Sequence, residues 1–278
     1  PTAAAGPPTD RDTASSAVVR AWERTSIRTI YTERGTAIPV GALYLGYTSL
    51  AMYRAVEAVG RRGSAGAAVA TAAHDVLAEY FPDSTSQLDA DLIASLAAIP
   101  DGWAKSQGQQ AGAQAADELI ASRVGDGRGD PSIVYHREPG PGVWPPSPTQ
   151  PAGMLAPWLG FVKPIIVPQP IDPRGVDGPP ALTSTTYARE FNEVKRLGSA
   201  TSSARTADQT ETALFFNSNS AIMVTEGLLT YLDSRPLTLR DTVQLFATMH
   251  TAMGDAMISC WRLKYDVGFW RPVQAING

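Results

Sequence analysis

The segment that decides the fold runs from residue 238 to residue 272 and reads TLRDTVQLFATMHTAMGDAMISCWRLKYDVGFWRP. Apolar side chains recur along it at steps of three or four residues, which is the period of one face of an α-helix. They are Phe246, Met249, Met253, Met257 and Cys260. Thr238 stands three residues before Asp241, a pattern typical of a helix N-terminus. The segment therefore predicts a long amphipathic helix with one buried face.

Two basic residues continue the same face. Lys264 follows Cys260 by four residues and Arg271 follows Lys264 by seven, so that the two side chains would lie about 10 Å apart along one helix. Pro272 predicts that the helix ends at Arg271, because the residue before a proline disfavours the helical conformation. The pattern thus places both cations on a face that is otherwise apolar.

A buried pair of cations requires an anionic partner. Burial of an unpaired cation is unfavourable by several kcal/mol, and an arginine cannot escape this by losing its proton. An oxyanion such as phosphate or vanadate, or a set of carboxylates, would neutralise Lys264 and Arg271. The alternative is that both are ordinary helix-end charges, which the helix dipole favours.

The rest of the chain predicts further helices. Helical spacing of apolar residues recurs over residues 14–58, and alanine, the residue with the highest helix propensity, dominates residues 67–123. Helical segments resume near Ser184. No stretch alternates polar and apolar residues as a half-buried strand does. We therefore predict an all-α fold, a helical bundle, in a single domain over residues 1–278.

Residues 131–180 interrupt the helical pattern. They contain fourteen of the 22 prolines, and Trp144 and Trp158 lie among them. Proline at this density excludes helices and central strands, whereas two tryptophans need a surface on which to pack. We predict a proline-rich irregular belt, at about residues 125–183, that is ordered against helices.

The composition excludes several classes of protein. The net charge is −4 and no basic run exceeds two residues, which argues against a nucleic-acid partner. No apolar run is long enough to span a membrane, and one cysteine with isolated histidines at positions 74, 136 and 250 cannot form a zinc site. The sequence begins at Pro1 without a methionine, which predicts a processed secreted or periplasmic protein, although a truncated start gives the same pattern.

A known motif covers the two cations. Residues 261–272, WRLKYDVGFWRP, match Lys-x6-Arg-Pro, the first signature of the superfamily of vanadium-dependent haloperoxidases and type 2 phosphatidic acid phosphatases. Other stretches similar to the secreted bacterial haloperoxidase-like branch are LAMY at 50–53, AAIPDG at 97–102, GPGVW at 140–144 and FNEVK at 191–195. With these companions, the chain resembles that branch over nearly its whole length.

The resemblance implies a helical bundle in which Lys264 and Arg271 bind the oxygens of a vanadate cofactor, with phosphate as a substitute. It implies a vanadate-dependent haloperoxidase that oxidises a halide with hydrogen peroxide, and Lys264 would also polarise the peroxide. Two alternatives remain open. One is an acid phosphatase that uses the same oxyanion pocket, and the other is a non-catalytic helical relative that serves as a binding module.

Two further signatures of the superfamily, Pro-Ser-Gly-His and Ser-Arg-x5-His, do not occur in the 278 residues. In the family, their histidines supply the acid/base group and the vanadium ligand. The resemblance therefore implies that these residues are the N-terminal half of a larger haloperoxidase-like domain. We expect a C-terminal half or a second fragment to complete the active site, and a homo-oligomer is also compatible with the sequence.

Overall fold

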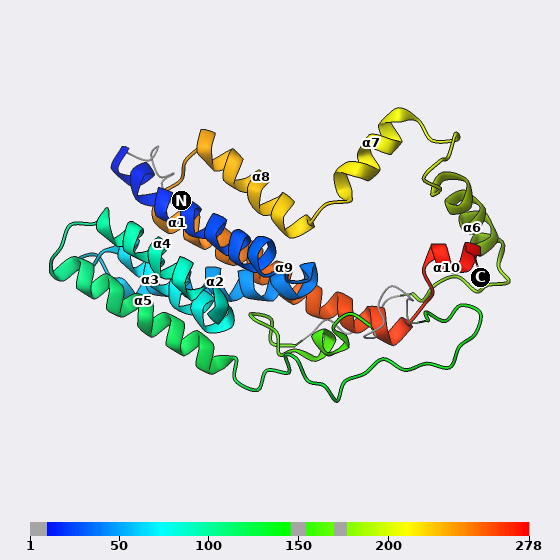
Figure 1. The fold of residues 1–278 in the computed structure, drawn as a ribbon, viewed down its shortest axis with the longest axis horizontal. Coiled ribbons are helices and arrows are strands. Elements are labelled where there is room, and N and C mark those ends of the chain that lie inside the picture. Colours follow the sequence, from blue (N-terminus) through cyan, green and yellow to red (C-terminus); the bar gives the residue numbers. More distant parts are fainter. Residues whose placement is uncertain (1–9, 146–153, 170–176, 278) are drawn as a thin grey trace, which may run out of the picture. The chain divides into compact units, whose positions relative to one another are not determined.

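The computed structural model describes residues 10–145, 154–169 and 177–277, and it is helical throughout its regular parts (Figure 1). Within these ranges, the β-structure consists of one isolated antiparallel bridge between Val143 and Phe269. The predicted all-α class is therefore confirmed.

The chain divides into two compact units, which we describe separately. The helical unit comprises residues 1–126, 163–168 and 220–257, and the belt unit comprises residues 127–162, 169–219 and 258–278. The last long helix belongs to both, because its residues are continuous across position 257. A single domain over residues 1–278 stays a prediction.

Within the described residues, the helical unit is built from seven helices or helix segments. They are α1 (Asp10–Ile27), α2 (Ile38–Val59), α3 (Ala65–Tyr80), α4 (Thr85–Ala97), α5 (Trp103–Ser122), α8 (Ser220–Ser234) and the first part of α9 (Leu239–Val267). Between α5 and α8 the chain passes through the belt unit. A π-helical turn, Arg28–Glu33, continues α1, and a short 3-10 helix, Pro82–Ser84, precedes α4. Fully buried Trp22, Leu45, Leu77 and Phe246 form part of its core.

Small residues let α3 and α5 approach backbone to backbone. A β-carbon added at Gly108 would lie 2.3 Å from the carbonyl oxygen of Ser64, and one at Gly112 would lie 2.6 Å from that of Ala68. Both distances are shorter than any real contact, so only glycine fits at these positions. The alanine-rich composition of α3 thus serves close packing as well as helix propensity.

The belt unit holds shorter helices between irregular segments. They are a 3-10 helix (Pro157–Phe161), α6 (Thr185–Leu197), α7 (Ala207–Phe216), the end of α9 and α10 (Pro272–Asn277). The side chain of Ser184 accepts a hydrogen bond at the start of α6, and Thr206 forms a reciprocal capping box with Gln209 at the start of α7. The local sequence therefore determines where both helices begin.

The two tryptophans of the proline-rich belt are at least partly buried, whereas most of residues 131–141 are exposed. Trp144 is buried and Trp158 is half-buried. Residues 163–168 belong to the helical unit, where Asp255 accepts hydrogen bonds from three consecutive backbone N–H groups, those of residues 165, 166 and 167. The remaining stretches of the belt, 146–153 and 170–176, lie outside the described residues.

Helix α9 departs from its prediction at two points. It begins as expected, because the backbone N–H of Asp241 donates to the Thr238 hydroxyl at 3.1 Å. It ends at Val267 rather than at Arg271, because Gly268 adopts a left-handed conformation with a φ of 57° that only glycine reaches readily. Cys260, predicted to be buried, is exposed.

The buried face of α9 is also rotated from the predicted one. Its most buried members are Val243, Phe246, His250, Gly254 and Ile258, whereas the three methionines of the predicted face are only half-buried.

No helix in the described part of the chain combines the length and the apolar character of a membrane span.

Candidate functional site

Lys264 lies in the last turn of α9, in the belt unit, and its ammonium group is surrounded by aromatic rings. The Nζ atom is 4.1 Å from the ring centroid of Trp261, 4.7 Å from that of Trp144 and 5.8 Å from that of Tyr265. Such contacts stabilise a cation by the negative faces of the rings, and more strongly where water is excluded. The half-buried side chain of Lys264 is therefore held in an aromatic enclosure.

Hydrogen bonds to the belt fix these rings. The indole N–H of Trp261 and the hydroxyl of Tyr265 both donate to the carbonyl oxygen of Leu155, at 3.0 Å and 2.5 Å. The ring of Trp144 stacks on that of Tyr265, with centroids 5.6 Å apart and an interplanar angle of 23°. The backbone N–H of Trp144 donates to the carbonyl oxygen of Gly268 at 2.8 Å. The turn that ends α9 thus positions Trp144 beside Lys264.

Arg271 shares one of these rings with Lys264. Its guanidinium carbon is 5.1 Å from the centroid of Trp144, so the same indole contacts both cations. Arg271 lies at the start of α10, where its backbone N–H donates to the side-chain oxygen of Gln274 at 2.9 Å. The side chain itself is exposed and is able to reach a ligand.

Neither cation has an ion-pair partner among the described residues. Burial lowers the pKa of Lys264, and the neighbouring positive charge of Arg271 lowers it further. Burial also raises the pKa of Tyr265 to about 12, which keeps its hydroxyl protonated and able to donate. The site therefore carries uncompensated positive charge, and an anion placed between the two cations would relieve it.

The structure brings Lys264 and Arg271 together, but not in the way that the sequence predicted. They do not lie on one face of one helix, because α9 ends between them at Val267. Instead, both contact the ring of Trp144, which the sequence analysis treated as packing within the belt. The GPGVW stretch at 140–144 was the signal that could have indicated this role, because it belongs to the resemblance that identified both cations.

The three histidines lie elsewhere. His136 is exposed and is 3.4 Å from Glu138. His74 bonds to Asp75 and Asp89, and His250 is fully buried in the helical unit. No group of three or more His, Cys, Asp and Glu side chains within the described residues is arranged to hold a metal ion.

Comparisons with known proteins show a likeness in three dimensions. No family model and no curated protein sequence matches the chain. The fold is similar to that of a crystal structure described as the first bacterial vanadium-dependent iodoperoxidase, with a TM-score of 0.72 and 18% sequence identity. The match covers 94% of this chain and 71% of the other. The chain therefore has the all-α fold of a vanadium haloperoxidase.

Proposed function

We propose that this chain carries the oxyanion-binding half of a vanadate-dependent haloperoxidase, with Lys264 and Arg271 as the residues that bind vanadate. The observation that supports this most directly is the pair of unneutralised cations on one indole ring, in a chain with a haloperoxidase fold. A lysine and an arginine held close together without carboxylates are unfavourable unless an anion joins them.

The donor set fits a tetrahedral oxyanion. Lys264 offers three N–H donors on a point charge, and Arg271 offers a planar fork that matches two oxygens at once. Each hydrogen bond to a charged group contributes about 1.5–3 kcal/mol. A bound anion would also restore the ammonium pKa of Lys264, which burial and Arg271 now lower.

Vanadate, when bound, supplies a Lewis acid that activates hydrogen peroxide toward a halide. The protein's own residues have separate tasks in the proposed reaction. Lys264 and Arg271 would hold the negative oxygens of the bound group, and the ammonium group of Lys264 would draw electron density from the oxygen that it contacts. Trp144, Trp261 and Tyr265 exclude water from the ammonium group and so strengthen its electrostatic effect.

The proposal requires groups that these 278 residues do not supply. An acid/base histidine and a histidine that bonds vanadium would come from a C-terminal half or a second fragment. The same two cations would bind phosphate, which is also a tetrahedral oxyanion, so an acid phosphatase remains the second candidate. Secretion and self-association remain predictions.

Titration calorimetry with orthovanadate tests the binding role in the complete protein, with inorganic phosphate as a second probe. Lys264→Ala and Arg271→Ala should each weaken vanadate binding more than tenfold, and Arg271→Lys should not restore it, because a point charge cannot replace the fork. Matched controls are Lys195→Ala and Arg262→Ala, which remove a cation from an aromatic ring elsewhere in the belt unit. Both controls should bind vanadate normally.

Activity assays separate the candidate functions. Peroxide-dependent halide oxidation that is lost in Lys264→Ala, without hydrolysis of a phosphomonoester, supports the haloperoxidase. Hydrolysis that depends on Lys264 and Arg271, without halide oxidation, supports the phosphatase. Unchanged vanadate affinity in both alanine variants would show that the two residues are ordinary helix-end charges and would overturn the proposal.

A further inference from the structure

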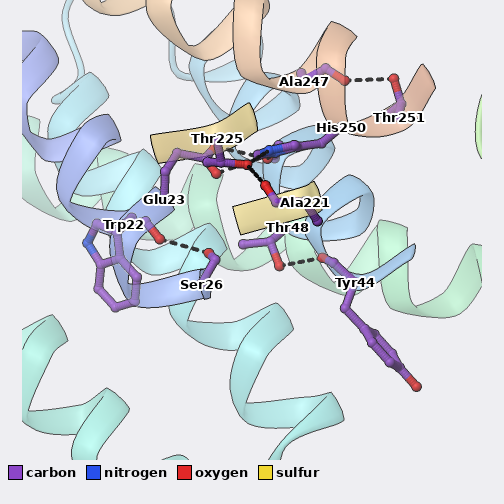
Figure 2. A network of polar contacts seen from close by, with 11 residues as sticks. Trp22, Glu23, Ser26, Tyr44, Thr48, Ala221, Thr225, Ala247, His250 and Thr251 are labelled. Atoms are coloured by element: carbon purple, nitrogen blue, oxygen red, sulfur yellow. Dashed lines mark hydrogen bonds and ion pairs between the residues drawn. The ribbon is translucent and has the colours of Figure 1, made fainter. Parts of the chain in front are cut away.

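A cluster of fully buried polar side chains joins four helices of the helical unit. Glu23 comes from α1, Ser49 from α2, Thr225 from α8 and His250 from α9, and each is 0% exposed. Figure 2 shows Glu23, Thr225 and His250 directed toward one another between these helices. Polar groups this deep persist only when they satisfy one another, so the arrangement of their protons can be deduced.

The hydrogen bonds run in one continuous chain. The Ser49 hydroxyl oxygen lies 2.9 Å from Oε1 of Glu23 and 2.7 Å from Nδ1 of His250. On the other side of the imidazole ring, Nε2 lies 3.0 Å from the Thr225 hydroxyl oxygen. The Thr225 hydroxyl donates to the carbonyl oxygen of Ala221 at 2.7 Å. Thr225 therefore uses its one proton on Ala221 and must accept from a protonated Nε2.

Ser49 also has one proton, which leaves two arrangements. In the first, a protonated Glu23 donates to Ser49, and Ser49 donates to an unprotonated Nδ1. In the second, Nδ1–H donates to Ser49, and Ser49 donates to an ionised Glu23. The two arrangements contain the same number of protons and differ only by the transfer of two protons along the chain. In both, Glu23 and His250 together hold one proton beyond the one on Nε2.

The first arrangement is favoured by its surroundings. Oε2 of Glu23 has no hydrogen-bond partner within the described structure and is 3.4 Å from Nδ1 of His250. An unpartnered carbonyl oxygen is far less costly to bury than an unpartnered carboxylate oxygen. The ring of Phe246, 5.7 Å from the imidazole, adds an apolar wall. The geometry thus favours a neutral acid and a neutral imidazole.

We propose that Glu23 and His250 share a single proton through Ser49, and that the helical unit loses stability when this proton is removed or when a second one is added. The inference does not depend on the proposed function. Because all four side chains are 0% exposed, they cannot reach a substrate. A change in their protonation therefore affects the stability of the packing between the four helices.

Among the described contacts of this cluster, the ionisable side chains are Glu23 and His250. The side chains from α2 and α8, Ser49 and Thr225, are hydroxyl groups that do not titrate in this pH range. Burial raises the pKa of Glu23 from 4.5 to about 8, against a smaller opposing effect of the Ser49 hydrogen bond. Burial lowers the pKa of His250 from 6.5 to about 3. The folded pair thus keeps one proton between about pH 3 and pH 8.

The unfolded chain takes up protons differently. Below its glutamate pKa of 4.5 it binds two protons, between 4.5 and 6.5 it binds one, and above its histidine pKa of 6.5 it binds none. Stability rises with pH where the unfolded chain holds more protons and falls where the folded protein holds more. The pair therefore stabilises the fold most between pH 4.5 and 6.5, and its contribution decreases on both sides.

Two substitutions test this proposal. Each removes one titrating group and therefore one of the two decreases of stability with pH. Against the wild type, Glu23→Gln should gain about tenfold in the folding equilibrium constant per pH unit from pH 4.5 to pH 8, because the amide mimics the protonated acid at every pH. His250→Gln should gain about tenfold per unit as the pH falls from 6.5 to 3. Urea unfolding across this pH range measures both differences. Glu226→Gln, the same substitution at an exposed position of α8, is the control and should not show this tenfold change per pH unit.

A measurement on the wild type needs no variant. With histidine labelled by ¹⁵N, one of the three side chains should keep the chemical shifts of the neutral, Nε2-protonated form from about pH 4 to pH 8. A doubly protonated buried imidazole in that range would show an ion pair and overturn the neutral arrangement. If the stability difference between Glu23→Gln and the wild type does not change with pH, the shared proton is refuted.

Discussion

Replacement of Asp255 by alanine tests how residues 163–168 are held within the helical unit. The buried side chain of Asp255 accepts hydrogen bonds from the backbone N–H groups of Ile165, Ile166 and Val167, at 2.5, 3.0 and 3.0 Å. At about 1.5–3 kcal/mol for each bond to a charged group, simple addition gives an upper bound of roughly 4.5–9 kcal/mol. Ile166 and Val167 are 57% and 40% exposed, so water can reach the freed N–H groups. We therefore expect the free energy of unfolding to fall by about 3–4 kcal/mol.

Urea unfolding and limited proteolysis measure this effect. Asp255→Ala should lower the unfolding midpoint and speed cleavage within residues 163–168, whereas Asp255→Asn, which keeps one acceptor oxygen, should lose about half as much stability. The control is Asp233→Ala, which breaks exposed ion pairs to Arg20 and Arg24 and should cost less than about 1 kcal/mol. An Asp255→Ala variant as stable as this control would refute the reasoning.

Further predictions concern substitutions at four other positions. Trp144→Phe should keep vanadate binding within a few-fold of the wild type. Trp144→Ala should weaken binding more and lower the free energy of unfolding by about 3–5 kcal/mol, because it removes a buried ring that contacts both cations. Calorimetry measures the change in binding, and urea unfolding measures the change in stability. Gly112→Ala should destabilise the protein by about 1–3 kcal/mol, because its β-carbon would lie 2.6 Å from the Ala68 carbonyl oxygen. Gly227→Ala, on a helix face where a β-carbon meets nothing within 4 Å, should instead stabilise it by about 0.5–1 kcal/mol in the same assay. The hydrogen bond to Asp75 is the largest cause that raises the pKa of His74 above 6.5. Protonated His74 therefore stabilises the folded protein fully below pH 6.5, and this stabilisation is lost as the pH rises through the pKa of the folded state. His74→Gln should remove that loss, which unfolding midpoints at about pH 5.5 and pH 8.5 would show.

The helical class could be predicted because its determinants are local. Alanine content, apolar spacing and the Thr238–Asp241 cap act within a few residues, and the structure contains the corresponding helices. The phase of α9 could not be predicted from apolar residues alone, because its buried face includes His250 and Gly254. A histidine is accommodated on that face because Ser49, 201 residues away, is a hydrogen-bond partner of Nδ1 and Thr225, on another helix, is a partner of Nε2.

The sequence named the two charged residues of the candidate site but did not predict the contacts that bring them close to Trp144. The motif identified Lys264 and Arg271, whereas Trp144 reaches them through the backbone hydrogen bond with Gly268 and through stacking on Tyr265. These contacts join residues more than 100 positions apart, and no periodicity within a segment reports them. The predicted helix end rested on Pro272 alone, and the signal that it missed was Gly268, a residue type enriched just beyond helix ends.

The contact of Trp144 with both Lys264 and Arg271 makes this residue an optical reporter. The excited state of an indole has a larger dipole than its ground state, so the emission maximum responds to nearby charges. An anion that draws the two cations away from the ring would shift the emission of Trp144, and the difference spectrum against Trp144→Phe would isolate that change from the signal of the other five tryptophans. Occupancy of the site could thus be followed by fluorescence, without any enzymatic turnover.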